Sequence, residues 1–441
     1  MSGARVGILL GMTNGAFTSP LAATLAPDVL DRFLRYVRVD TQSSREHSGT
    51  PSTPGQLELG RILVDELHEL GIEDASVDEH GYVMATLASN DGAGAPVIGL
   101  LAHIDTSPDA PGAGVEPIVH REYAGGVIDL PQNGTKLNPE SMPELTGMQG
   151  HDIVTSSGDT LLGADDKAGV AEIMAAVAHL ASHPELPRPT LRIGFTPDEE
   201  IGMGAITFDI DRFGARCAYT LDGSDLGELQ DETFSAAEVR VIVHGIEVHP
   251  GEAKGKLVNA LRLAAQIVAA LPSDGLTPET TSGREGFIHP YEITGSPGLA
   301  EFRAIVRDFD EDALEQHIDL LRRTAHEVVD AEPRARLEMK VRSQYKNMRR
   351  YIDAAPEVVD AADEAMRAEG IEPVNTPVRG GTDGSILSAR GLPTPNIFTG
   401  GHEYHSVREW ASLQEMAAAS ATIVRLAEVW SRPEFSAAGA K

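Results

Sequence analysis

The stretch VIGLLAHIDTSPD (97–109) decides the fold class of this chain. It opens with an apolar run, Val97 to Ala102, that has the length of one strand and is followed at once by polar residues. Two more apolar runs lie at Leu191 to Phe195 and Cys217 to Leu221, and a helical pattern covers Ala168 to about Ala181. Short runs that are apolar throughout, joined by crossover helices, are typical of buried parallel strands. We therefore predict an α/β fold with a largely parallel sheet.

An insert interrupts this pattern. From about Asp231 the apolar residues alternate along the chain, and strands and helices then follow as in a two-layer α+β domain. The apolar run near the N-terminus, Val6 to Met12, is at the lower length limit of a secretory signal and is followed by polar residues. The predicted organisation is an extension outside the fold (1–27), an α/β domain in two parts (28–231 and 348–441) and the inserted domain between them (232–347).

Composition and charge restrict which classes of partner the protein can bind. The chain has 441 residues, of which 41% are hydrophobic and 23% are charged, as in an ordinary folded protein. Its 36 basic and 67 acidic residues give a formal net charge of -31, which repels phosphate backbones and anionic lipids. We therefore expect no nucleic-acid and no membrane partner. The single cysteine, Cys217, excludes an intrachain disulfide and a cysteine-based metal site, and it fits a reducing, cytoplasmic setting.

Polar residues follow the predicted strands, at the sheet edge where parallel sheets bind their ligands. His103 and Asp105 follow the first strand, and their side chains point the same way in an extended segment, so Asp105 can orient a metal-bound His103. The other candidates are Asp165, Asp166, Glu199, Glu200, Asp222, His402 and His405. Histidine and carboxylate side chains together suit zinc or a related divalent ion.

Each candidate also has an ordinary structural explanation. Asp165 and Asp166 could cap the crossover helix, and Glu199 and Glu200 could form a solvated pair. The repetition of such residues at one sheet edge favours a metal site over these explanations. Spacing alone leaves open which member of each acidic pair binds the metal.

Eight segments resemble one known family. They are AHIDTSPD (102–109), LLGADDKAG (161–169), FTPDEEIG (195–202), YTLDG (219–223), HPGEAKGKLVNAL (249–261), VRDFD (306–310), RGGTDG (379–384) and FTGGHEYH (398–405). In this order they resemble the peptidase T family, the tripeptide aminopeptidase branch of the dizinc exopeptidases and aminoacylases. The resemblance covers about residues 28–435. It implies a dizinc catalytic α/β domain with an inserted lid or dimerisation domain.

The resemblance also implies a role for each candidate at a centre of two zinc ions per chain. The residues that match metal ligands are Asp165, which bridges both ions, His103 and Asp222 at one site, and Glu200 and His405 at the other. Glu199 matches the general base, which activates a water that bridges the metals. Asp105 matches the residue that orients the metal-bound histidine.

Four further residues match substrate-binding positions of the family: His249, Asn259, Arg307 and Arg379. The histidine matches an oxyanion-stabilising group, and the other three match substrate clamps. In the glycine-rich segment 379–384 a tight loop lets a guanidinium bind a carboxylate through two hydrogen bonds. From the residues alone, Arg307 would instead form an exposed salt bridge with Asp308 or Asp310. His402 departs from the family pattern, and its alternative role is that of a competing metal ligand.

Three functions compete. The first is a zinc-dependent aminopeptidase that hydrolyses the N-terminal residue from tripeptides. The second is an N-acyl amino acid amidohydrolase or a carboxypeptidase of the same superfamily, but those branches often carry glutamate at the position of Asp222. The third is an inactive peptide-binding relative, which would be expected to lose the base, whereas Glu199 is present. The expected partners are a small peptide and a second copy of the chain, bound through the insert.

Overall fold

The computed structural model describes residues 17–47, 49–90, 94–432 and 435. The chain divides into two compact units. The first unit contains the chain up to Asp231, Tyr351–Thr376 and the chain from Arg390 onward; the second contains Glu232–Arg350 and Pro377–Ala389. Within the described ranges, no helix has both the length and the apolar character needed to cross a membrane.

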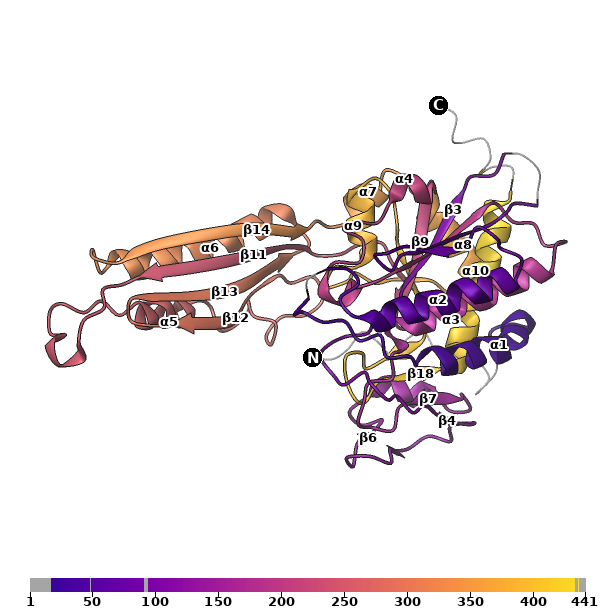
Figure 1. Cartoon of the computed structure of the whole chain (residues 1–441), viewed down its shortest axis with the longest axis horizontal. Coiled ribbons are helices and arrows are strands. Elements are labelled where there is room, and N and C mark those ends of the chain that lie inside the picture. The colour runs from indigo at the N-terminus through magenta and orange to yellow at the C-terminus, as the bar shows by residue number, and fades with distance from the viewer. Residues whose placement is uncertain (1–16, 48, 91–93, 433–434, 436–441) are drawn as a thin grey trace. The chain divides into compact units, whose positions relative to one another are not determined.

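An eight-stranded sheet lies at the centre of the first unit (Figure 1). Its order is β1 (Ser76–Val77), β2 (Val83–Leu87), β8 (Leu191–Thr196), β3 (Ile98–His103), β9 (Cys217–Gly223), β16 (Asn396–Phe398), β10 (Glu228–Gln230) and β15 (Val374–Asn375). The three apolar runs of the sequence form β3, β8 and β9, and β3 is parallel to both of its neighbours. β2 and β10 pair antiparallel with β8 and β16. The predicted α/β class with a largely parallel sheet is confirmed.

Helices cover this sheet. They are α1 (Pro20–Tyr36), α2 (Pro54–Glu69), α3 (Ala164–Ser182), α4 (Ile210–Phe213), α8 (Glu357–Ala368) and α10 (Leu413–Trp430). α3 packs on β3 and β9 and also contacts α1 and α10, whereas α2 packs on β1 and β2. α10 is buried around nearly its whole circumference and is rich in alanine, so its neighbours approach it closely.

Between β3 and α3 the chain forms short elements. They are β4 (Ile118–His120), β5 (Ile128–Asp129), β6 (Lys136–Leu137), the 3-10 turn η1 (Pro143–Gly147) and β7 (Ile153–Thr155). β4 and β7 join β17 (Gly401–His402) and β18 (Trp410–Ser412) in a small antiparallel sheet. This sheet attaches the segment 401–412 to the chain that leads into α3.

The second unit has a four-stranded antiparallel sheet in the order β12 (Phe287–Gly295), β13 (Leu299–Asp308), β11 (Ser235–His244) and β14 (Arg336–Tyr345). α5 (Ala260–Ala270) and α6 (Glu311–Asp330) pack on one face of this sheet (Figure 1). The remaining elements are the 3-10 turn η3 (Pro250–Glu252), α9 (Asp383–Ala389) and, where the two units meet in sequence, α7 (Arg349–Ile352). The alternating apolar residues predicted for the insert face these helices because a strand places every second side chain on the same face.

The predicted N-terminal extension, 1–27, is wrong for residues 20–27, which form the first two turns of α1. Ser19 caps this helix, and Leu25 is buried in the core of the first unit. Pro27, the last residue of the predicted extension, lies inside α1. The apolar face on both sides of this proline is buried, and that burial outweighs the one backbone hydrogen bond that proline removes. Residues 1–16 lie outside the described residues.

The second unit also differs from the predicted insert, 232–347. It extends to Arg350 and includes Pro377–Ala389, which the sequence assigned to the α/β domain. Thr233 forms a β-bridge with Val378, and the N–H of Phe234 donates to the carbonyl of Val378 at 3.0 Å. These backbone contacts hold a segment that is distant in sequence against the start of β11.

Candidate metal centre

Three neighbouring strands of the first unit end at one edge of the sheet. β8, β3 and β9 are adjacent and parallel, so their carboxyl ends lie together. His103 is the last residue of β3, and Asp222 lies near the end of β9. The 3-10 turn η2 (Glu199–Ile201) follows β8, and Asp165 belongs to the first turn of α3.

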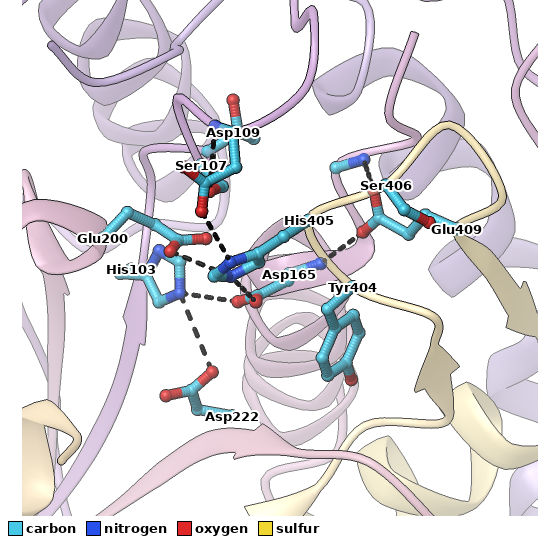
Figure 2. Close-up of polar contacts among 12 residues, drawn as sticks. His103, Ser107, Asp109, Asp165, Glu200, Asp222, Tyr404, His405, Ser406 and Glu409 are labelled. Carbon is cyan, nitrogen blue, oxygen red and sulfur yellow. Dashed lines mark hydrogen bonds and ion pairs between the residues drawn. The ribbon is translucent and has the colours of Figure 1, made fainter. Parts of the chain in front are cut away.

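The carboxylate of Asp165 lies in the middle of the site (Figure 2). Its Oδ1 is 2.8 Å from Nε2 of His103, and its Oδ2 is 3.2 Å from Nε2 of His405. On the first side, Oδ1 of Asp222 is 3.7 Å from Nε2 of His103. On the second side, Oε2 of Glu200 is 2.9 Å from Nε2 of His405. The five predicted ligands thus come together as two groups that share Asp165.

Asp166 is the alternative that spacing left open. Among the described residues, potential ligand atoms cluster in two sets, which are His103 with Asp165 and Glu200, and His103 with Asp166 and Asp222. The carboxylate of Asp166, however, accepts hydrogen bonds from the backbone N–H of His103 at 3.0 Å and of Gly169 at 3.2 Å. Since the oxygens of Asp165 face imidazoles instead, the geometry favours Asp165 as the shared ligand.

The site gathers negative charge where water has little access. Burial raises the pKa of Glu200 to about 8, and the charge of Asp165 adds to this shift. Burial also raises the pKa of Asp222. Oε1 of Glu200 is buried without a hydrogen-bond partner in the part of the chain that is described. Buried carboxylates with an unsatisfied oxygen fit a divalent cation, which balances their charge and takes up the free lone pairs.

The two imidazoles lie in a strongly negative field. Hydrogen bonds to Asp165 and Glu200 raise the pKa of His405 to about 11. Burial by itself lowers the pKa of His103, but hydrogen bonds to Asp105, Asp165 and Asp222 together raise it well above its ordinary value. The same negative field favours a bound cation next to Nε2 of either ring, once that nitrogen has lost its proton.

Asp105 supports both sides of the site. It is fully buried, and its Oδ1 lies 3.3 Å from Nδ1 of His103, so a proton on Nδ1 leaves Nε2 as the free lone pair. Its carboxylate also accepts hydrogen bonds from the backbone N–H of Glu199 at 3.0 Å and of Glu200 at 3.2 Å. The half-exposed Glu199 is in neither cluster of potential ligands.

Gly169 sets the distance between α3 and β9. A Cβ at this position would lie 2.1 Å from the carbonyl oxygen of Leu221, so a larger residue would push the helix away from the strand. Asp165 and Asp222 are carried by these two elements. The close approach thus brings their carboxylates to the same point.

Comparison with known proteins decides the family. Peptidase T of Shouchella clausii (strain KSM-K16) is 48% identical over 402 residues, which cover 91% of this chain and 98% of that protein. Peptidase T of Bacillus subtilis (strain 168) is 46% identical with the same coverage. The chain belongs to the peptidase T family. The resemblance seen in the sequence is confirmed, and as a member of this family the chain is a metallo-exopeptidase.

Solved structures show the same fold. The aminopeptidase PepT from Bacillus cereus ATCC 10987 has a TM-score of 0.70 at 22% identity, and the match covers 92% of this chain and 99% of that one. A tripeptidase from Staphylococcus aureus has a TM-score of 0.72 at 20% identity with the same coverage. A dinuclear metal binding peptidase of the M20 family from Bacillus subtilis has a TM-score of 0.62 at 17% identity, over 92% of this chain and 98% of that one. Residues 232–331 match the family model of the peptidase dimerisation domain.

His402 is engaged away from the metal cluster. It is buried, its Nε2 lies 3.1 Å from Oε2 of Glu415, and its Nδ1 lies 3.4 Å from Oδ1 of Asp225. Its ring stacks on Trp410 with 4.0 Å between centroids. Both ring nitrogens thus face carboxylates outside the cluster, which argues against a role as a competing ligand.

The two arginines expected to clamp substrate lie in the second unit. Arg379 donates to the carbonyls of Gly283 and Glu285 at 3.0 and 2.9 Å and to the hydroxyl of Thr281 at 2.8 Å, so its guanidinium anchors a loop. Arg307 donates to the carbonyl of Arg379 at 3.2 Å, and its Nε is buried without a partner among the described atoms. Of the two, Arg307 has the unsatisfied donor.

The expected salt bridge of Arg307 has no counterpart in the described contacts. Oδ2 of Asp308 lies 2.9 Å from Nε2 of His317, and Oδ1 of Asp310 accepts from the N–H of Ala313 at the start of α6. Both carboxylates are therefore used elsewhere.

The other two substrate candidates also lie in the second unit. Oδ1 of Asn259 accepts from the N–H of Arg262 at 3.0 Å and caps α5. His249 is exposed, and its Nδ1 accepts from the N–H of Gly251 at 3.1 Å. The observed contacts of Asn259 are those of a helix cap, and the printed contact of His249 lies within its own turn.

Two neighbours of the site were not singled out in the sequence, although both lie inside the quoted motifs. Tyr404 donates from its hydroxyl to the carbonyl of Gly223 at 3.0 Å and lies 3.0 Å from Oγ1 of Thr399, so it bridges the ends of β9 and β16. Oδ2 of Asp109 lies 3.6 Å from Nδ1 of His405 (Figure 2). Neither residue belongs to a pattern that spacing alone could detect.

Proposed function

We propose that this chain is a zinc-dependent aminopeptidase that hydrolyses the N-terminal residue from tripeptides. The observation that carries the proposal is the carboxylate of Asp165, with one oxygen beside His103 and the other beside His405. The relatives named peptidase T, and the tripeptidase with the same fold, support this substrate class.

The proposed cofactor is a pair of zinc ions in each chain. The proposed ligands are His103, Asp165 and Asp222 for one ion and Asp165, Glu200 and His405 for the other. Imidazole and carboxylate ligands suit zinc in catalytic sites, and the dinuclear metal binding peptidase of the same fold supports a count of two. Zinc ions bound there would polarise the scissile carbonyl and lower the pKa of a water molecule.

Glu199 is the proposed general base. Its carboxylate would accept the proton of the attacking water and then donate it to the nitrogen of the leaving amine. Asp105 serves this step indirectly, since it binds the backbone N–H of both Glu199 and Glu200 and orients His103. The buried carboxylate of Asp105 would then position the proposed base, Glu199, and two proposed ligands, Glu200 and His103.

The second unit would supply the substrate-binding residues. We propose that Arg307 binds the terminal carboxylate of the tripeptide, because its buried Nε lacks a partner among the described residues. His249 would stabilise the oxyanion, and Asn259 and Arg379 would complete the clamp. Each additional residue lengthens an extended peptide by ~3.3 Å. A displacement of this size breaks the pair of hydrogen bonds between a guanidinium and the terminal carboxylate. Such a clamp selects for length.

The proposed setting is a cytoplasmic homodimer. The match of residues 232–331 to a peptidase dimerisation domain supports self-association through the second unit. The buried free thiol of Cys217 is compatible with a reducing compartment.

A panel of four peptides tests the function. We expect high kcat/KM for Ala-Ala-Ala and much lower values for Ala-Ala, Ala-Ala-Ala-Ala and acetyl-Ala-Ala-Ala, with all activity lost in chelator and restored by Zn²⁺. Equal values for the three- and four-residue peptides would contradict the length clamp. Preferred cleavage of the acetylated peptide would point to the amidohydrolase alternative, and activity that survives complete metal removal would contradict the zinc centre.

A further inference from the structure

The carboxylate of Glu409 holds the loop that carries Asp165. Its Oε2 accepts hydrogen bonds from the backbone N–H groups of Leu162 at 2.7 Å and Gly163 at 2.8 Å, and its Oε1 accepts from that of Asp165 at 3.0 Å (Figure 2). Glu409 is only 1% exposed. Burial of a carboxylate is costly unless hydrogen bonds satisfy it, and here all three donors belong to a single loop.

Glu409 and His405 belong to the same turn. The hydroxyl of Ser406 donates to the carbonyl of Glu403 at 2.8 Å, and the N–H of Glu409 donates to the carbonyl of Ser406 at 3.2 Å. These bonds shape the turn that carries both side chains. The imidazole of His405 contacts the carboxylate of Asp165, and the carboxylate of Glu409 accepts a hydrogen bond from the backbone N–H of Asp165.

We propose that Glu409 is the positioning residue of Asp165 and keeps this shared ligand in register with His405. The two ligands come from distant parts of the sequence, and a metal site tolerates errors of only ~0.5 Å in their placement. Hydrogen bonds from the loop's N–H groups to a buried carboxylate supply this precision before any ion binds. The inference rests on the metal centre proposed above.

Glu409→Gln tests the proposal. The amide keeps one acceptor oxygen for the N–H groups of Leu162 and Gly163. Its NH₂ group then faces the N–H of Asp165, so the hydrogen bond to Asp165 is lost. Zinc affinity is measured by titrating Zn²⁺ into the metal-free full chain in competition with a chromogenic chelator. We expect about 10- to 100-fold weaker binding, as is usual when a partner of a metal ligand is lost. The visible spectrum of the Co²⁺-loaded variant should also change, because the geometry at Asp165 changes.

Glu172→Gln is the matched control. Glu172 lies in α3, as Asp165 does, and it is fully buried with neither carboxylate oxygen hydrogen-bonded among the described residues. The substitution removes a buried acid from the same helix without touching the loop, so zinc affinity should equal that of the wild type. If Glu409→Gln fails to fold in the absence of metal, Glu409→Asp carries the same test, because it keeps the charge but reaches less far.

Three outcomes separate the possibilities. Wild-type zinc affinity and Co²⁺ spectrum in the folded Glu409 variant would overturn the proposal. Equal weakening in Glu172→Gln would also overturn it, since the effect would then come from any lost buried acid. A wild-type chain that binds no zinc would instead overturn the proposed metal centre itself.

Discussion

Oε2 of Glu200 lies 2.9 Å from Nε2 of His405, while Oε1 of the same carboxylate is buried without a hydrogen-bond partner among the described residues. Glu200 follows β8, whereas His405 follows the small strand β17. One oxygen therefore faces the imidazole of His405, and the other is free to bind a cation of the proposed centre. Glu199, its neighbour in the same 3-10 turn, is in neither ligand cluster.

We expect Glu199→Gln and Glu200→Gln to fail in different ways. The first should keep both zinc ions but lose turnover by at least ~10²–10⁴-fold, because an amide cannot accept and return a proton. The second should weaken zinc binding, because it removes a charged ligand. Turnover of Ala-Ala-Ala and zinc content are measured on each purified variant. The reverse pattern would show that the two roles are exchanged.

The shared position of Asp165 predicts the metal count of ligand variants. Elemental analysis of the wild type should find two divalent ions per chain. His405→Asn should retain one ion, and Asp165→Asn should weaken both sites because both ions lose a ligand. His402→Gln is the control and should retain two, since its ring nitrogens face Glu415 and Asp225. Loss of an ion in this control would make His402 a ligand.

Glu172 predicts a pH-dependent stability. Burial raises the pKa of this carboxyl well above its ordinary value. A carboxyl whose pKa is raised by folding leaves stability intact while it is protonated in both states, and lowers stability as the pH rises above its unfolded pKa. Relative to the wild type, Glu172→Gln should therefore gain stability as the pH rises from about 4 to about 8. Urea unfolding at both pH values measures the difference, and an equal gap at the two values would contradict it.

Arg307, whose Nε has no hydrogen-bond partner among the described residues, is proposed to bind the terminal carboxylate of the substrate. Arg307→Ala should lower kcat/KM for Ala-Ala-Ala by about 10- to 100-fold, the usual effect of losing a charge-assisted hydrogen bond. The kcat/KM of the same variant for Ala-Ala-Ala-amide, which lacks the terminal carboxylate, should stay close to that of the wild type. Arg303→Ala is the matched control, because Arg303 lies on the same face of β13 and pairs with Glu301. Equal losses for the acid and the amide would exclude carboxylate recognition by Arg307.

Local sequence was sufficient for the elements that position the site. A strand buried on both faces is mostly apolar, so β3, β8 and β9 were visible as largely apolar runs in spite of Arg192 in β8, and the polar ends of β3 and β9 named His103 and Asp222. The start of α1 was not visible in this way. Pro27 is an ordinary helix-start signal, and it is overridden here by packing against helices that are distant in sequence.

The sequence by itself determined the α/β class and the family, and it named the residues that we propose as metal ligands, because strand burial and ligand chemistry each restrict which residue types occur at a position. Only the tertiary structure showed how the two neighbouring carboxylates differ, since that of Asp166 accepts hydrogen bonds from backbone N–H groups. This difference supports Asp165, which the resemblance had implied, as the proposed shared ligand. The tertiary structure alone also revealed Glu409, whose three hydrogen bonds join segments that no local pattern connects. Side-chain direction and long-range contacts depend on how the whole chain packs, and a sequence motif does not contain that information.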